Sequence, residues 1–326
     1  MEFSLIEAIT RRTAQAREDV VLGVGDDAAL LDVPAGQQLA AAVDTLVEGV
    51  HFPKGTAPAD IGYKALAVNL SDLAAMGAMP AWSLLALTLP APDADFVEGF
   101  AQGFAQAAAP YRMALVGGDT TSGPLCVSVT VHGLVPQGAA LRRDGARQGD
   151  VVMVTGTLGD AAGGLACLDR SHPRAAALME APEALRAALL TRLNRPEPRV
   201  AAGLQLREVA TACIDVSDGL LADLAHITAA SGVGAHIDAA ALPLSSALLT
   251  LFPEQATALA LGGGDDYELC FTVPADAAAQ VSADLARLGC GATRIGRIVA
   301  GEGVRAFDAE GQDVTPPRRG WEHFGA

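Results

Sequence analysis

The chain has 326 residues, of which 51% are apolar and 4% aromatic, and it carries a formal net charge of −16. Its length exceeds that of a usual single domain, so two domains with separate cores are expected. A surface this acidic repels nucleic acid and anionic lipid, which excludes both as expected partners.

The sequence also argues against a membrane or secreted protein. The longest apolar stretch, residues 65–89, is broken by Asp72, Gly77 and Pro80, so no transmembrane span is expected. The N-terminus has no basic region followed by an apolar run, so no signal peptide is expected. The five cysteines are widely spaced and form no CxxC pair. A reducing compartment, the cytoplasm, is therefore the expected location.

Hydrophobic periodicity predicts the elements of the first half of the chain. In chain order they are a helix at 3–16, a strand at 39–43 that delivers Asp44 at its end, a long buried helix at 61–76, a buried strand at 82–89, a surface helix at 93–111 and a half-buried strand at 126–134. In the last of these, valines at odd positions alternate with polar residues at even positions, as expected for a strand with one buried face.

A glycine-rich loop at 136–150 is the expected boundary between the domains, which we place at 1–137 and 138–326. Beyond it the pattern predicts strands at 151–155, 212–214, 268–273 and 293–299, and helices at 159–168, 182–193, 200–206, 220–230 and 277–288. Strands and helices mix in both halves without a strict βαβ rhythm. Two α+β domains are therefore favoured over one doubly wound sheet.

Two common nucleotide-binding loops are absent from the sequence. There is no GxxxxGK[ST] motif, which excludes a P-loop kinase. The segment Gly23-Val-Gly-Asp-Asp-Ala imitates a dinucleotide-binding loop. However, Asp26 and Asp27 would stand where a pyrophosphate must approach the backbone, and no helical pattern follows.

Instead, aspartates recur at the ends of apolar segments. They are Asp26, Asp27, Asp44, Asp72, Asp119, Asp215 and Asp218. Oxygen ligands without clustered His or Cys select hard cations, Mg²⁺ first. Taken singly, most of these aspartates also suit turns or helix caps. The Asp-Asp pair before Tyr267 could likewise belong to a glycine turn that enters a strand.

Asp72 has no such structural explanation in its own segment. It is the only ionisable residue between Lys64 and Asp93, and it falls on the same helical stripe as Ile61 and Ala65. Burying a lone carboxylate there would cost several kcal/mol unless a cation or strong donors met it. Asp72 is therefore expected to be functional.

Taken together, seven segments in order resemble the thiamine-monophosphate kinase family of the AIR synthetase-like (PurM-like) superfamily. They are residues 25–31, 44–52, 63–77, 117–121, 154–160, 214–220 and 263–269. The resemblance extends from about Phe3 to Phe324. It implies an N-terminal α/β domain that forms the interface of a homodimer, and a C-terminal α/β domain that completes the site for ATP and the acceptor.

The resemblance also implies site residues. Asp27, Asp44, Asp72, Asp119, Asp215 and Asp218 look like ligands of several Mg²⁺ ions. Gly118, Asp119, Arg143 and Ser217 would contact ATP, and His51, Asp265 and Trp321 would line the acceptor site. Ala42 and Val43 stand where relatives often carry hydroxyl residues, so a metal contact there must use backbone oxygens. Asp265 stands where glutamate is common in the family, and its shorter side chain changes the acceptor contact.

The implied reaction is direct transfer of the ATP γ-phosphate to thiamine monophosphate, with no residue needed as a general base. K⁺ stays open as a further ion. The alternative within the superfamily is another ATP-dependent enzyme, a purine-pathway cyclase or amidotransferase subunit. A non-catalytic Ca²⁺-binding protein is a second alternative, but no EF-hand spacing is present, and such a protein would not explain Asp72.

Overall fold

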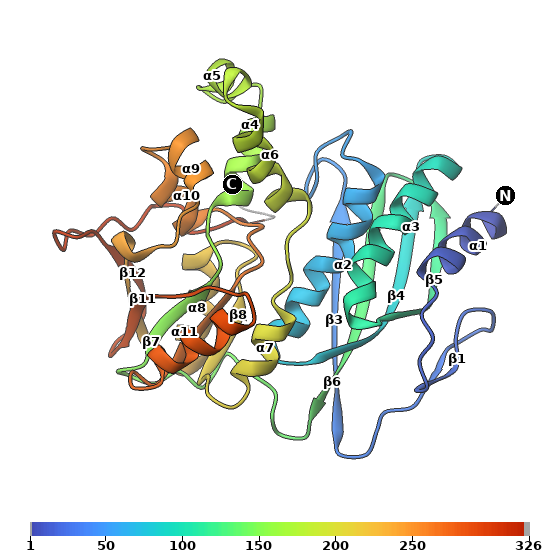
Figure 1. The fold of residues 1–326 in the computed structure, drawn as a ribbon, viewed down its shortest axis with the longest axis horizontal. Coiled ribbons are helices and arrows are strands. Elements are labelled where there is room, and N and C mark those ends of the chain that lie inside the picture. The colour runs from blue at the N-terminus through green and yellow to red at the C-terminus, as the bar shows by residue number, and fades with distance from the viewer. Residues whose placement is uncertain (1, 323–326) are drawn as a thin grey trace. The chain divides into compact units, whose positions relative to one another are not determined.

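The computed structural model describes residues 2–322, with side chains from residue 5, and divides them into two compact units. One unit comprises residues up to 73 together with 78–140, and the other comprises residues 74–77 together with those from 141 onward (Figure 1). No helix of the described chain is both long and apolar enough to cross a membrane.

The first unit is built on a four-stranded sheet with the order β3-β6-β4-β5, in which only the β4–β5 pair is parallel. Helices α2 and α3 run along this sheet (Figure 1). Its elements are α1 (Glu2–Thr13), β1 (Val20–Leu22), β2 (Leu30–Leu31), β3 (Gln37–Val47), α2 (Pro58–Ala75), β4 (Met79–Leu89), α3 (Ala94–Ala108), the 3₁₀ helix η1 (Ala109–Tyr111), β5 (Ala114–Ser122) and β6 (Cys126–Pro136).

The second unit is built on a six-stranded sheet with the order β12-β9-β11-β7-β10-β8, antiparallel except between β12 and β9. Its elements are β7 (Val151–Thr155), α4 (Asp160–Leu168), α5 (Ala175–Glu180), α6 (Glu183–Asn194), α7 (Val200–Leu206), β8 (Ala212–Asp215), α8 (Leu220–Ser231), β9 (Gly234–Asp238), the 3₁₀ helix η2 (Ala239–Ala241), α9 (Ser246–Leu251), α10 (Ala256–Gly262), β10 (Leu269–Val273), α11 (Ala278–Arg287), β11 (Ala292–Val299) and β12 (Gly303–Phe307).

Each unit buries its own apolar core, as the length of the chain predicts. In the second unit, leucines of α8 pack on Val152, Val154 and Ile214 of the sheet. In the first unit, the alternation predicted for β6 is confirmed, because Val127, Val129 and Val131 are fully buried and the residues between them are not. The α+β class is confirmed in both units.

Several predicted boundaries are wrong. The strand expected at 39–43 extends to Val47, so Asp44 lies inside β3 rather than at its end. Asp119 likewise lies within β5, a strand that was not predicted because two consecutive glycines interrupt its pattern. The short elements β9, β12, α5, α9 and α10 were also missed. By contrast, the strand at 151–155 and the helix at 200–206 are confirmed.

Candidate active site

A hydrogen bond at the free edge of β3 joins Asp44 to helix α2, which also carries Asp72. The backbone N–H of Asp44 donates to Oδ1 of buried Asn69 at 3.0 Å, and Nδ2 of Asn69 donates to the carbonyl of Ala65 at 2.9 Å. Asn69 thus covers the strand edge from α2, one helical turn before Asp72. Asp72 is half-buried rather than fully buried.

The same hydrogen bond determines which peptide oxygens near Asp44 are accessible. Along an antiparallel strand, successive peptide groups point alternately to the neighbouring strand and away from it. Because the Asp44 N–H points to α2, the carbonyl of Ala42 also faces the free edge, whereas that of Val43 points to β6 opposite Thr130. Of the two predicted backbone contacts, Ala42 has the more available oxygen.

His51 lies in the turn after β3 with a defined tautomer. Its Nδ1 accepts the backbone N–H of Val47 at 3.0 Å, so in the neutral ring the proton is on Nε2. The ammonium of Lys64 donates to the His51 carbonyl at 3.1 Å, and Lys64 itself is buried. Sequence reasoning noted Lys64 only as a neighbour of Asp72. A lysine within an apolar helix needs a hydrogen-bond acceptor, and this could have indicated such a contact from the sequence.

Gly118 and Asp119 lie on β5, at the opposite edge of the sheet from Asp44. The register aligns Asp44, Val129, Leu85 and Gly118 across the four strands. Three strand spacings separate Asp44 from Gly118, about 14 Å. A single cation bound directly by both the Asp44 and the Asp119 carboxylates would have to span this distance.

The loop that carries Asp27 lies beside β5. Val24 and the segment 117–120 line one small pocket together with residues of α1. Asp27 is exposed, and its backbone N–H donates to Oδ1 of Asp26 at 2.8 Å. Val24, three residues before Asp27, and Asp119 thus line the same pocket.

Gly118 occupies a position that only glycine fits. A Cβ atom there would lie 1.9 Å from the carbonyl oxygen of Leu85 on β4, which is closer than two non-bonded atoms can approach.

We expect Gly118→Ala to destabilise the protein by about 1–3 kcal/mol, as overpacking does. Urea denaturation measures this. At Gly117 the nearest atom is the end of the flexible Leu84 side chain, at 3.0 Å. An equal loss of stability in Gly117→Ala would show that the Leu85 carbonyl is not the cause.

In the second unit, Asp223 holds the loop after β8, which carries the predicted site residues Ser217 and Asp218. Asp215 ends β8, and the backbone N–H groups of Ser217, Asp218 and Gly219 all donate to one oxygen of Asp223, at 3.0, 3.1 and 3.0 Å. Burial and then the nearby charge of Asp215 raise the pKa of Asp223 to about 7. Sequence reasoning missed Asp223. An acidic residue in the first turn of a helix after Asp-Gly was the available signal.

Backbone hydrogen bonds join this loop to the predicted acceptor residues. The N–H of Asp265 donates to the Ser217 carbonyl at 2.8 Å, and the N–H of Trp321 donates to the Asp218 carbonyl at 2.9 Å. The Arg318 guanidinium lies 5.4 Å from the centre of the Trp321 ring, which is 46% exposed. The structure therefore gathers Ser217, Asp218, Asp265 and Trp321 in one cluster.

Arg143 is exposed on a loop that is tied to the same unit. Its carbonyl accepts the hydroxyl of Ser231 at 2.9 Å, and the carbonyl of Arg142 accepts the backbone N–H of Cys213 on β8 at 2.9 Å. These bonds fix the loop against the strand that carries Asp215. The exposed guanidinium of Arg143 is thus available for phosphate.

The donor chemistry of the predicted ligands fits Mg²⁺. Among the described residues, no three His, Cys, Asp or Glu side chains are grouped closely enough to hold a metal ion. The predicted ligands are oxygen donors only, which suits a hard cation. Near β8, burial is the largest cause of the raised pKa of Asp223, and the charges of Asp215 and Asp218 raise it further. A bound cation would relieve this repulsion.

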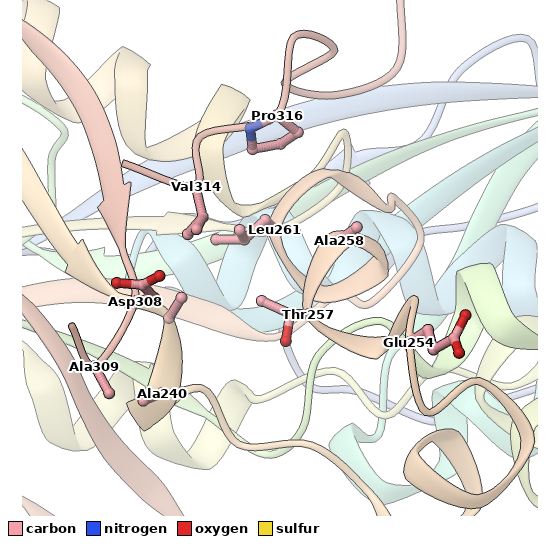
Figure 2. Close-up of a pocket in the computed structure, with 10 residues that line it drawn as sticks. Ala240, Glu254, Thr257, Ala258, Leu261, Asp308, Ala309, Val314 and Pro316 are labelled. Carbon is pink, nitrogen blue, oxygen red and sulfur yellow. The ribbon is translucent and has the colours of Figure 1, made fainter. Parts of the chain in front are cut away.

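A larger pocket lies elsewhere in the second unit. It has a volume of about 410 Å³ and is lined by apolar residues together with Glu254, Thr257 and Asp308. Figure 2 shows these two carboxylates on different sides of the pocket rather than converging. None of the predicted site residues lines it. It is not part of the candidate active site.

The two α+β units with aspartate-bearing loops define the chain as an AIR synthase related protein. The family model for the N-terminal domain of these proteins matches residues 25–135, and that for the C-terminal domain matches residues 147–309. Thiamine-monophosphate kinase of Escherichia coli (strain K12) is 49% identical over 324 residues, which cover 99% of this chain and 98% of that protein.

Two solved structures agree with this assignment. Thiamine-monophosphate kinase from Stenotrophomonas maltophilia K279a is 52% identical, with a TM-score of 0.86 over 94% of this chain and 96% of that one. AaThiL complexed with AMPPCP and TMP is 35% identical, with a TM-score of 0.76 over 99% of this chain and 97% of that one. The chain belongs to the thiamine-monophosphate kinase family, as its motifs predict.

Proposed function

We propose that this chain transfers the γ-phosphate of ATP to thiamine monophosphate, giving thiamine diphosphate and ADP, in the cytoplasm. The relatives at 49% and 52% identity carry this activity in their names, and AaThiL binds AMPPCP and TMP together. The observation that carries the proposal is the cluster in the second unit. There, the backbone bonds from Asp265 and Trp321 join the expected acceptor residues to Ser217, an expected ATP contact, and to Asp218, an expected Mg²⁺ ligand.

We assign metal and ATP binding to the domain at 1–137, and completion of the ATP and acceptor sites to the domain at 138–326. The proposed Mg²⁺ ligands are Asp27, Asp44, Asp72, Asp119, Asp215 and Asp218, with a backbone oxygen at Ala42 or Val43. Gly118, Asp119, Arg143 and Ser217 are assigned to ATP, and His51, Asp265 and Trp321 to the acceptor.

The proposed reaction does not require the protein to remove a proton from the acceptor. A phosphate monoester has a second pKa of about 6 and is largely ionised near neutral pH, so its oxygen can attack the γ-phosphorus in line without a general base. The difficulty is repulsion between two polyanions on a protein that is itself acidic. Mg²⁺ held by the proposed carboxylate ligands would supply positive charge that offsets the charge of the phosphate oxygens. The chain's own part is to hold carboxylates in fixed positions, as Asn69 and Asp223 do, and to orient the acceptor.

Product analysis tests the proposal. The protein is mixed with ATP, Mg²⁺ and thiamine monophosphate, and thiamine diphosphate and ADP are quantified. Equal amounts of both products are expected. A parallel reaction with purine-pathway intermediates tests the alternative enzyme class, and addition of K⁺ tests the further ion. Turnover of a purine intermediate but not of thiamine monophosphate would contradict the proposal.

A homodimer through the sheet of the first unit is part of the same proposal. Apolar side chains are exposed in rows across adjacent strands of this sheet. Leu39 and Met79 are both paired in register with Leu134, and Val43 and Leu84 are both paired with Thr130. Leu39, Val43, Met79 and Leu84 are 46%, 62%, 45% and 36% exposed. Contiguous apolar surface of this kind is typical of a protein interface, and a second copy of the same sheet can cover it.

We expect Leu84→Asp to weaken the dimer by at least about tenfold in Kd, because a carboxylate would be buried without a partner. Light scattering after size-exclusion chromatography measures the change in mass. The matched control is Leu165→Asp on α4, since Leu165 is 49% exposed and outside this sheet. A wild-type chain that is monomeric at micromolar concentration, or a Leu84 variant that stays dimeric, would contradict the proposed interface.

A further inference from the structure

The segment that bears Asp265 has an unusual backbone. Asp265 and Tyr267 have φ angles of +69° and +50°, and among the described residues only Arg112 joins them as a non-glycine residue with positive φ. Left-handed conformations are unfavourable for residues with a Cβ, and they persist where the surrounding structure enforces them. Such residues are concentrated at functional sites, where neighbouring groups hold the backbone in place.

Asp266 and Glu268, which each follow one of the two strained residues, are anchored inside the second unit. Asp266 is 1% exposed, and its carboxylate accepts the backbone N–H of Gly159 at 2.7 Å. Glu268 is fully buried and accepts the hydroxyl of Thr155 at 2.6 Å and the guanidinium of Arg199 at 2.7 Å. The buried anchors thus lie at alternate positions, 266 and 268, between and after the two strained residues.

The backbone of the two strained residues is held as well. The N–H of Tyr267 donates to the Val216 carbonyl at 2.8 Å, alongside the bond from Asp265 to Ser217. In this arrangement the Tyr267 hydroxyl donates to Oδ1 of Asp265 at 3.2 Å. Both side chains are only half-buried, so the pair lies at the surface of the cluster that includes Trp321.

We propose that Tyr267 is a positioning residue of the acceptor site, which orients the Asp265 carboxylate toward the cationic, hydrogen-bond-donating ring portion of the acceptor. The inference rests on the proposed function and deepens it. A short aspartate side chain has few orientations, and a hydroxyl bonded to one of its oxygens selects among them. The anchors at Asp266 and Glu268 maintain the backbone that brings the two side chains together.

This arrangement predicts that acceptor binding, and not ATP binding, depends on the Tyr267 hydroxyl. Tyr267→Phe is expected to raise the KM for thiamine monophosphate about tenfold, the scale of one hydrogen bond to a charged group. The KM for ATP and the thermal unfolding midpoint should stay near their wild-type values. Isothermal titration with thiamine monophosphate should show the same loss of affinity without turnover.

Asp265→Gly gives a second, independent measurement. Glycine adopts positive φ without strain, so this variant is expected to be at least as thermally stable as the wild type while its KM for thiamine monophosphate rises. Adding Tyr267→Phe to it should then have no further effect on that KM, because the hydroxyl has lost its partner. A purely structural role for Asp265 would instead lower stability.

The outcomes separate the inference from the proposed function. If the wild type neither binds nor phosphorylates thiamine monophosphate, the function and the inference both fail. If the wild type is active but Tyr267→Phe leaves the acceptor KM unchanged, only the inference fails. The inference is also overturned if that substitution raises both KM values equally, or if its effect is undiminished in the Asp265→Gly background.

Discussion

Asp72→Asn and Asp215→Asn should each lower kcat by about 10²- to 10³-fold, which is the scale for removing one group that stabilises charge in a transition state. Asparagine keeps the size of aspartate and removes its charge, so the fold should be retained. Asp72 is on α2 of the first unit and Asp215 ends β8 of the second. Equal losses at these two positions would indicate that both units contribute charge to one reaction.

The same two variants should also differ from the wild type in their dependence on Mg²⁺. A variant that lacks one carboxylate should need more Mg²⁺ to reach half of its maximal rate, since the loss is in cation binding. Initial rates over a range of Mg²⁺ concentrations measure this, with circular dichroism to verify folding. Asp95→Asn is the matched control, because Asp95 is an exposed aspartate in the first turn of α3. Near-normal rates for both active-site variants would disprove the proposed mechanism.

The fold class could be predicted from the sequence because the buried strands carry regular patterns. The alternation in β6 and the apolar run of β7 were sufficient for their assignment. The position of Asp44 was predicted less well. A charged residue after an apolar run suggested the end of a strand, but β3 stays paired with β6 as far as Val47, and the Asp44 N–H on the opposite edge donates to Asn69. That contact spans 25 residues and has no signature in local periodicity.

The candidate site residues came from motifs, whereas the residues that hold their backbone in place were not predicted. Asp223 and Asn69 act through hydrogen bonds to backbone groups, and any Asp or Asn in a helix could do the same. Glu268 was part of a recognised motif, yet its partners Arg192 and Arg199 are 76 and 69 residues away. Tertiary pairing of this kind becomes visible only in the folded chain.

The Glu268 pairing leads to the largest expected effect on stability. Glu268→Leu would leave the guanidinium groups of Arg199 and Arg192 without the buried carboxylate that now bonds to both. Removing one partner of a buried ion pair costs about 3–5 kcal/mol because the remaining charge is uncompensated. We expect a loss of unfolding free energy of this size in urea denaturation.

A second ion pair of Arg199 provides the control for this experiment. It also forms an ion pair with Glu197 at 2.8 Å, but the Glu197 side chain is 68% exposed whereas that of Glu268 is fully buried. Water screens the exposed pair, so Glu197→Gln should cost at most about 1 kcal/mol. The double variant Glu268→Leu with Arg199→Met removes one of the two stranded charges and should recover part of the lost stability. If Glu268→Leu cost no more than Glu197→Gln, the buried cluster could not be what holds the backbone at Asp265 and Tyr267 in its strained conformation.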